Sequence, residues 1–390
     1  MYRNFKFDVI DSYEKSRLGI LKTPHGSFRT PAFIFCGTKA SVKGISPQQL
    51  LETGTQVLLA NTYHLFSFPR SEYLKERGGL HKFMGWNGPM LTDSGGFQIF
   101  SLGHGSIADE VKGKRSGKTT LIKIDEDGAF FRSYWNGDLQ LLTPEKSIDT
   151  QRNLGADLIV SFDECTPYHL NKKYTEQSME RSHRWEKRSL NEFIRCNDFS
   201  QALYGVVQGG IYEDLRKRSA VFVSENSFFA TAIGGTLGAS KQQMYEVVEM
   251  ATTSLDTSRP IHLLGIGGIF DIFKGVALGI DTFDCVHPTR IARHGGALVK
   301  FQYRDSQNRE HINLKRSEYA TDDDPIESDC NCSTCRCFSR AYLHYLLKAN
   351  EILALSAVTI HNIHFMNMLM EEIRKGILNK NLDHVRDKWC

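Results

Sequence analysis

The sequence predicts an α/β fold, a (β/α)8 TIM barrel, and three observations support this prediction. Short apolar runs recur along the chain, and each ends in polar residues or glycine. Several segments between the runs have helical periodicity, such as residues 174–193 and 241–255. No glycine-rich phosphate fingerprint follows the first run, whereas the competing doubly wound sheet would require one. Apolar strands that alternate with helices form a parallel sheet, and a barrel brings their polar ends to one face, where active sites lie.

The predicted barrel strands are seven apolar runs, preceded by an N-terminal antiparallel β segment. Residues 5–10 alternate in polarity, and residues 17–34 carry a turn between apolar runs, which indicates antiparallel strands. Ser46 and Pro47 fit the cap and the first position of a helix. The seven runs, each with the residue that follows it, are 57–60 (Asn61), 89–92 (Asp93), 158–162 (Asp163), 203–207 (Gln208), 228–233 (Gly234), 261–264 (Gly265) and 276–283 (Asp284).

Two segments interrupt the alternation of strands and helices. Residues 120–142 contain the turn pairs Asp127–Gly128 and Asn136–Gly137 between β-type runs, which predicts a small antiparallel meander. Further on, the composition turns polar and then cysteine-rich. We therefore predict a catalytic barrel domain over residues 1–304, which includes the meander. A cysteine-rich subdomain and the closing helices of the barrel are predicted over residues 305–390.

The bulk composition is that of a soluble globular protein, with 41% hydrophobic and 24% charged residues in a chain of 390. The net charge of +3, from 48 basic and 45 acidic residues, is too small to indicate nucleic acid by itself. The N-terminus has no apolar signal-peptide core, and no run of eighteen apolar residues exists, so we expect no membrane span. Nine cysteines without a secretion signal favour a reducing cytoplasm, with thiols or metal ligands rather than disulfides.

Three cysteines near the C-terminus have the spacing of metal ligands. Cys330, Cys332 and Cys335 place three thiols within six residues, which is a strong metal signal in a cytoplasmic chain. A chance cluster of free cysteines is the competing explanation. With one imidazole, the thiolates would form a closed tetrahedral zinc site, which is structural rather than catalytic. The spacing leaves four candidates for the fourth ligand: Cys337, His344, His361 and His364.

An acid and two arginines follow the last predicted strand. Asp284 ends the apolar run, and Arg290 and Arg293 come after the next turn. A carboxylate can act as a nucleophile, and arginine side chains can hold phosphates. The pattern therefore suits attack on an anionic substrate. A loop cap and two surface arginines are the alternative interpretation, because a single motif is only a hypothesis.

Six motifs occur in one order and together resemble queuine/tRNA-guanine transglycosylase of the bacterial type. They are DSGGFQ at 93–98, FDEC at 162–165, VQGG at 207–210, FDCV at 283–286, PTR at 288–290, and Cys-x-Cys-x-x-Cys at 330–335 followed by SRAYLH at 339–344. The resemblance covers nearly the whole chain. It implies a TIM barrel with an inserted zinc subdomain, and a homodimer. The implied activity exchanges the wobble guanine of GUN anticodons (the tRNAs for Asp, Asn, His and Tyr) for a 7-deazaguanine base, preQ1 or queuine, in queuosine modification.

The resemblance also implies roles for individual residues. Asp284 matches the nucleophile, and Asp93 matches the general acid/base. One structural zinc ion per chain is implied. The other implied roles are hydrogen bonds to the base from Asp163, Gln208 and the backbone of Gly235, a place beside the base for Cys165, a sandwich of the base by Phe97 and Leu264, tRNA-backbone contacts by Arg290 and Arg293, and zinc ligation by Cys330, Cys332, Cys335 and His361.

Exchange of a base at an anomeric carbon requires these residue types. A double displacement, as in retaining glycosidases, uses a carboxylate nucleophile that would hold the tRNA covalently. The incoming base loses a proton as it attacks, and a second acid can take that proton. A carboxylate accepts from the N–H donors of a guanine edge, while an amide and a glycine N–H donate to its carbonyl. An aromatic and an aliphatic wall are expected, because the guanine must leave the anticodon stack.

The chain departs from the family pattern after Gly235. Bacterial members often continue Leu-Ala-Val-Gly-Glu, whereas Thr236 and Ser240 stand at the first and last of these positions here. Both residues flank the loop that matches the base contact. We therefore expect a wider or less selective base pocket, in which queuine competes with preQ1. The basic loop at residues 112–118 resembles an insertion, and it fits either a phosphate-backbone contact or a solvated run.

Two other functions remain as alternatives. A non-catalytic tRNA-binding subunit of the same fold would be expected to lose one of the key acids, but Asp93, Asp163 and Asp284 are all present. A sugar hydrolase on a TIM barrel also uses paired acids, but it does not explain the cysteine cluster or the arginine pair.

Overall fold

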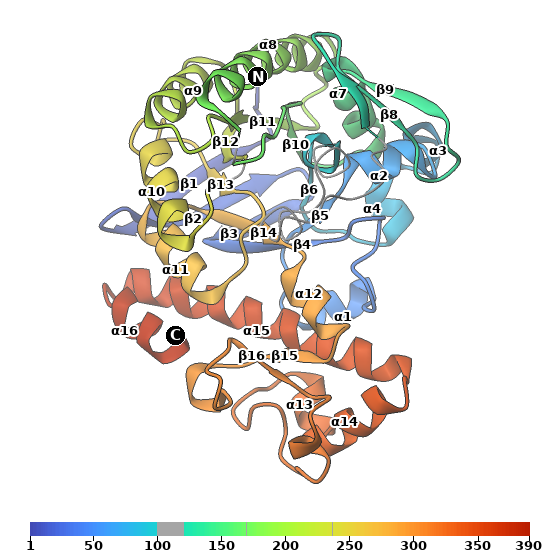
Figure 1. The fold of residues 1–390 in the computed structure, drawn as a ribbon, viewed down its shortest axis with the longest axis vertical. Helices are drawn as coiled ribbons and strands as arrows, with labels where there is room; N and C mark the ends of the chain where they lie inside the picture. Colours follow the sequence, from blue (N-terminus) through green and yellow to red (C-terminus); the bar gives the residue numbers. More distant parts are fainter. Residues whose placement is uncertain (100–120, 169, 236) are drawn as a thin grey trace.

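The computed structural model describes residues 1–99, 121–168, 170–235 and 237–390. Within these ranges eight parallel strands close into a barrel, and helices surround it (Figure 1). The predicted α/β fold, a TIM-type barrel, is confirmed. In barrel order the strands are β4 (Ala32–Cys36), β5 (Leu58–Ala60), β6 (Met90–Thr92), β10 (Leu158–Val160), β11 (Ala202–Val207), β12 (Ala230–Ile233), β13 (Ile261–Leu263) and β14 (Thr282–Cys285).

Two predicted strands were placed wrongly. β4 is the first barrel strand and pairs in parallel with β14 and β5, although its sequence was included in the antiparallel segment at 17–34. The apolar run at 276–283 is not one strand, because α11 (Ile269–Ala277) occupies its start and the chain turns at Gly279 with a φ of +92°. β4 is buried on every face, and residues 276–283 are buried apart from the exposed Ala277 and the half-buried Leu278. Periodicity cannot separate a buried strand from the end of a mostly buried helix.

Helices follow the barrel strands at the positions that the alternating pattern predicts. α8 (Lys172–Arg195) and α10 (Lys241–Thr252) occupy the two segments with helical periodicity. α1 (Pro47–Glu52) begins after the predicted Ser46 cap, whose hydroxyl accepts from the N–H of Gln49. The other helices of the barrel are α2 (Thr62–Ser67), α3 (Ser71–Glu76), α4 (Gly79–Met84), α7 (Pro144–Leu154), α9 (Glu213–Glu225) and α12 (His287–Ala292).

The segment with the two turn pairs forms a three-stranded antiparallel sheet, with β7 (Leu121–Ile124), β8 (Ala129–Arg132) and β9 (Leu139–Leu142) in that order. Its buried Phe131 packs with Tyr63 of α2, which attaches the sheet to the barrel beside β5. The basic loop at 112–118 lies outside the described residues.

The N-terminal sheet covers the end of the barrel where the strands begin. It contains β1 (Lys6–Tyr13), β2 (Ser16–Thr23) and β3 (Gly26–Thr30). Arg17 of β2 pairs with Asp281, the residue before β14. The polar strand ends therefore open at the opposite end of the barrel, which the sheet leaves uncovered.

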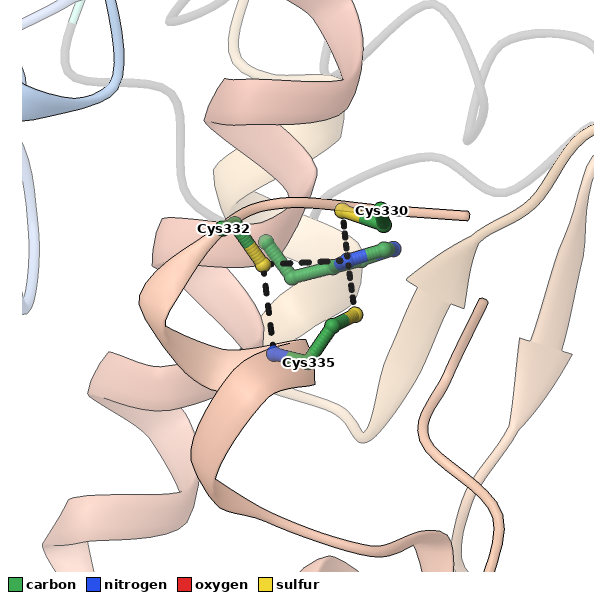
Figure 2. Close-up of side chains that lie close together, drawn as sticks. Cys330, Cys332 and Cys335 are labelled. Atoms are coloured by element: carbon green, nitrogen blue, oxygen red, sulfur yellow. Dashed lines mark hydrogen bonds between the residues drawn. The ribbon is translucent and has the colours of Figure 1, made fainter. Parts of the chain in front are cut away.

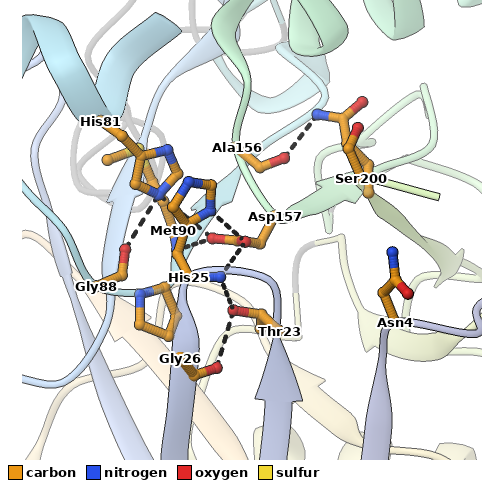
Figure 3. A network of polar contacts seen from close by, with 12 residues as sticks. Asn4, Thr23, His25, Gly26, His81, Gly88, Met90, Ala156, Asp157 and Ser200 are labelled. Carbon is orange, nitrogen blue, oxygen red and sulfur yellow. Dashed lines mark hydrogen bonds and ion pairs between the residues drawn. The ribbon is translucent and has the colours of Figure 1, made fainter. Parts of the chain in front are cut away.

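Asp157, which is fully buried, joins this sheet to the barrel through a network of polar contacts (Figure 3). Its Oδ1 accepts from the ring Nδ1 of His25 at 2.7 Å, and its Oδ2 accepts from the backbone N–H of Met90 at 2.9 Å. The ring of His81 stacks on that of His25 with centroids 3.6 Å apart, and its Nε2 lies 3.4 Å from Oδ2. Burial would raise the pKa of Asp157, but the hydrogen bonds from His81 and His25 hold it below its ordinary value. The charged Asp157 carboxylate therefore stabilises the folded protein.

Asp157→Ala is expected to destabilise the protein by about 3 kcal/mol near neutral pH, because the Met90 N–H and the histidine rings lose their acceptor. A lowered folded-state pKa means that this contribution is present above the ordinary aspartate value of about 4 and is lost as the pH falls through the folded value. Urea unfolding of both proteins at about pH 7 and about pH 3 measures the effect. Their difference should shrink at the lower pH, and an equal difference at both would contradict this account.

The C-terminal region has a smaller core beside the barrel. The long helix α15 (Ile352–Leu378) contributes Val358 to this core and Met366 to the barrel core. Of the described helices, only α15 has the length and composition of a membrane span, and 56% of that stretch is buried inside the protein. A domain boundary at residue 304 stays a prediction. The other elements of the region are β15 (Gly296–Leu298), β16 (His311–Asn313), α13 (Ser333–Cys337), α14 (Arg340–Lys348), α16 (Leu382–Trp389) and the 3-10 helices Phe301–Tyr303 and Ser317–Tyr319.

Candidate active site and metal centre

Asp284 lies near the end of β14, where the barrel opens. Its Oδ1 accepts from the backbone N–H of Gly265, which follows β13, at 2.9 Å. The thiol of Cys36, at the end of β4, donates to Oδ2 at 3.6 Å. Burial, and then the charge of Asp284, raise the pKa of this thiol well above its usual range, so it remains a donor. The Asp284 side chain is 13% exposed, so its carboxylate is held on both sides and still reaches the barrel mouth.

Asp93 follows β6 at the same end of the barrel. Its Oδ1 accepts from the backbone N–H of Thr62 at 2.7 Å, and its Oδ2 accepts from the amides of Asn61 and Gln98. Burial raises the pKa of Asp93 to about 6 despite these hydrogen bonds, and the charge of Asp284 adds to the rise. A carboxyl group with this pKa can both give and take a proton near neutral pH.

Asp163 and Gln208 form a buried pair at the ends of the neighbouring strands β10 and β11. Asp163 accepts from the hydroxyl of Ser94 at 2.9 Å and from Nε2 of Gln208 at 2.7 Å. Burial raises the pKa of Asp163, and the hydrogen bonds from Ser94 and Gln208 oppose the rise. Among the described residues, Oε1 of Gln208 has no hydrogen-bond partner. The pair therefore offers hydrogen-bonding atoms for a planar polar group.

Glycine is required beside this pair. Gly235, after β12, has a φ of +80°, and a Cβ there would lie 2.5 Å from Oε1 of Gln208. The backbone thus approaches the amide more closely than any side chain would permit. Arg216 of α9 is fully buried and donates to the carbonyls of Val207 and Gly234 at 2.9 and 2.8 Å. It ties together the two strand ends that carry Gln208 and Gly235.

The three remaining candidates for base contacts have different environments. Leu264, after β13, is half-buried, and its Cδ1 lies 3.5 Å from where a Cβ on Gly234 would be. Cys165 is buried. Phe97 is 47% exposed and directly follows Gly96, where a Cβ would lie 2.4 Å from the carbonyl oxygen of Asp163. All three therefore lie at strand ends or beside Asp163, while their roles stay predictions.

Four basic side chains lie on the segments that follow the barrel strands β4 and β14. Arg290 of α12 is exposed, and Arg293 directly after it is half-buried. Burial lowers the pKa of Lys43, and the charges of Arg293, Lys39 and Arg290 lower it further, so these cations repel one another electrostatically. A cluster of this kind suits phosphate groups.

The metal-ligand candidates come together around one imidazole (Figure 2). Nδ1 of His361, on α15, lies 3.8, 3.7 and 3.3 Å from the sulfurs of Cys330, Cys332 and Cys335. These separations match the edges of a tetrahedron around an ion about 2.3 Å from sulfur and about 2.1 Å from nitrogen. Nε2 of His361 donates to the carbonyl of Leu298 at 2.8 Å, which orients the ring as metal-bound histidines require.

Comparison with known proteins decides the family. The family described as "Queuine tRNA-ribosyltransferase" matches residues 11–390. The chain belongs to this family. It is 43% identical to the queuine tRNA-ribosyltransferase of Roseiflexus sp. (strain RS-1), over 99% of this chain and 98% of that protein. It is 45% identical to the enzyme of the same name from Protochlamydia amoebophila (strain UWE25), over 96% and 95% of the two chains.

Four residues of the candidate site could not be identified from the sequence of this queuine tRNA-ribosyltransferase family member. Lys39 and Lys43 follow β4, and they were overlooked because that strand was placed in the antiparallel segment. Gln98 stands in a recognised motif, but no spacing rule shows that its amide turns to Asp93. His262 lies inside an apolar run, where a histidine is typical of a satisfied core residue.

The predicted role of Ser240 in the base pocket does not agree with the structure. Ser240 is exposed, and its hydroxyl caps α10 by accepting from the N–H of Gln243. Serine is a favoured N-cap residue, so the local chemistry explains it without a ligand. An acid at this position would lie at a helix end in solvent. Thr236 lies outside the described residues.

Proposed function

We propose that this protein exchanges the wobble guanine of GUN anticodons, in the tRNAs for Asp, Asn, His and Tyr, for a 7-deazaguanine base in queuosine modification. The observation that carries the proposal is the placement of Asp284 and Asp93 at one barrel mouth in different environments. Asp284 has one oxygen held by a backbone N–H and the other facing a thiol, whereas Asp93 has a pKa of about 6. Such a pair divides the work of nucleophile and acid/base.

The reaction is a double displacement. In the first step, a carboxylate oxygen of Asp284 forms a bond to C1′ of the ribose as the bond from C1′ to guanine N9 breaks, and Asp93 gives a proton to the departing base. In the second step, N9 of the incoming base forms the new bond to C1′. The ester bond to Asp284 breaks, and Asp93 takes back a proton from the base. Because the incoming base and not water attacks C1′, the base is exchanged and no abasic tRNA is left.

The base pocket selects a guanine edge. Asp163 accepts from the adjacent N–H donors of the base, and the Gln208 amide and the backbone N–H of Gly235 donate to its carbonyl. Phe97 and Leu264 form the two walls, with Cys165 beside the base. Burial of Asp163 supports this role, because a hydrogen bond to a carboxylate strengthens when water is excluded.

The basic cluster of Arg290, Arg293, Lys39 and Lys43 binds the anticodon backbone.

The non-catalytic subunit is not favoured, because all three acids are present in the site. Both preQ1 and queuine are candidate bases. Ser240 is exposed, so it gives no reason to prefer one base over the other.

The proposal is tested by incubating the enzyme with tRNA and labelled guanine, and by running the mixture on a denaturing gel. Incorporation of label and a protein–tRNA band that free base releases are the expected results. A protein that binds tRNA without either signal would be the non-catalytic subunit. Adding unlabelled preQ1 and queuine side by side identifies the preferred base.

We also propose that the Cys3His cluster holds one structural Zn2+. The donor set supports zinc, because three thiolates and one imidazole close a tetrahedral site without an open position. When bound, the ion would link the loop of Cys330 and the cap of α13 to α15 through His361.

Cys332→Ser is expected to lose most of the metal and to lower Tm by about 5–10 °C, because the ion stabilises the folded subdomain. Cys337→Ser is the matched control, since Cys337 is an exposed thiol outside the cluster. Elemental analysis and thermal unfolding of freshly purified proteins measure both effects. A Cys332→Ser protein that retains an equimolar ion would rule out the site.

A cytoplasmic homodimer is the proposed state of the enzyme. None of the nine cysteines forms a disulfide, in keeping with a reducing compartment. Large apolar side chains are exposed around the junction of α14 and α15, including Tyr345 and Ile352. A self-complementary contact there would bury this surface, and sedimentation equilibrium tests it.

A further inference from the structure

His262 of β13 is a fully buried histidine inside the barrel, next to the proposed nucleophile. Its Nε2 lies 3.2 Å from Oδ1 of Asp284 on the neighbouring strand. Its Nδ1 lies 2.9 Å from the hydroxyl of Thr282, two residues before Asp284. Nδ1 has a hydrogen-bond partner in Thr282, whereas Nε2 approaches Oδ1 without hydrogen-bond geometry and has no hydrogen-bond partner among the described residues. A buried imidazole with an unpaired polar atom is costly, and a small turn of the ring or of the carboxylate would let Nε2 bond to Oδ1.

The proton positions follow from the chemistry of the neighbours. A carboxylate brings no hydrogen, so Nε2 must carry one where it faces Oδ1; two lone pairs at this separation would repel. In the neutral ring Nδ1 is then the acceptor, and the Thr282 hydroxyl donates to it. Thr282 thereby fixes the tautomer and the orientation of the ring.

We propose that His262 is a positioning residue for Asp284: its Nε2–H and the Gly265 N–H both face Oδ1, so that Oδ2 is the attacking oxygen. This inference rests on the proposed function. The same two donors face the carbonyl oxygen of the ester once the tRNA is bound. They stabilise the charge that returns to this oxygen when the incoming base breaks the ester, so the second displacement benefits as well.

The groups around Asp284 support different roles for its two carboxylate oxygens. Among the described residues, the thiol of Cys36 is the one polar group recorded beside Oδ2 of Asp284. A thiol is a weak donor, so a substrate can displace it. The titratable groups that face His262 are Asp284 on β14 and Tyr204 on β11, whose ring lies edge-on at 6.5 Å. Burial raises the pKa of Tyr204, so this ring adds no charge.

The experiment compares two replacements of His262. His262→Phe keeps an aromatic ring of similar size and removes the donor, whereas His262→Gln retains an N–H near the same place. For His262→Phe we expect kcat to fall about 10- to 100-fold, somewhat less than the loss of an oxyanion-hole donor costs, with little change in KM for tRNA. A fall in kcat with an unchanged KM distinguishes the loss of positioning from a loss of tRNA binding. His262→Gln should stay within about threefold of the wild type.

Thermal unfolding shows whether each variant is folded, and Thr282→Val provides a second approach. That variant leaves the ring in place but removes the group that orients it, so kcat should fall while Tm changes little. If His262→Phe does not fold, the rate of Thr282→Val decides the question.

Equal kcat values for wild type and His262→Phe would overturn the inference, as would equal impairment of the Phe and Gln variants. These outcomes are distinct from failure of the proposed function. If the wild type itself forms no covalent adduct with tRNA, the proposed function has failed. If the wild type reacts and the His262→Phe variant matches it, only the role of His262 has failed.

Discussion

Asp284→Asn is expected to abolish both base exchange and the denaturation-resistant band with tRNA. An amide is a far weaker nucleophile than a carboxylate, and loss of a covalent nucleophile lowers kcat by roughly 10⁴-fold or more. The fold should survive, because an asparagine oxygen can still accept from the Gly265 N–H. The variant should therefore bind tRNA with near-normal affinity while incorporating no labelled guanine.

The control for this experiment is the same measurement after checking by mass spectrometry that the asparagine has not deamidated. Cys36→Ser serves as a neighbour control, because it keeps a donor beside Oδ2 and should retain most activity. Near-normal turnover of an intact Asp284→Asn protein would show that Asp284 only holds the loop after β13.

The barrel could be predicted because most of its strands carry a local signal, a short apolar run with a polar end. The two errors, at β4 and at residues 276–283, concern stretches that are fully or mostly buried. Their state depends on pairing with partners that lie far away in the chain, such as β4 with β14. No local pattern encodes a partner at the other end of the sequence, so only the closed barrel settles the register.

The candidate site was predictable as a set of residue types, but its hydrogen bonds were not. Asp163 and Gln208 follow strands that prove to be neighbours, so barrel closure brings them within 2.7 Å. The role of His262 depends on its distance to Asp284 on the next strand, which sequence cannot supply. The role proposed for Ser240 failed for the opposite reason, because its local role as a helix cap outweighs its nearness in sequence to Gly235.

Asp93→Asn is expected to slow exchange by about 10³-fold, the usual value of a positioned acid/base group. Single-turnover measurements can separate its two roles. Formation of the tRNA adduct needs the protonated carboxyl, so this rate in the wild type should fall as the pH rises through about 6. Release of the adduct by free base needs the carboxylate, so this rate should rise through the same pH. Both dependences should disappear in the variant, because an amide does not titrate there.

If Asp93 only capped a loop, the Asp93→Asn variant would keep the wild-type rates and unfold at a lower temperature. Thermal unfolding tests this alternative. The pKa of Asp93 is raised by burial, so its ionisation costs stability above the ordinary aspartate value of about 4, and this cost grows until the pH passes the folded value near 6. Replacing it with a neutral amide removes that cost. The Asn61 and Gln98 amides can turn to meet the new side chain, so Asp93→Asn should be at least as stable as the wild type at about pH 8. A variant that keeps the wild-type rates but unfolds at lower temperature would make Asp93 a structural residue and leave the proton transfer to another group.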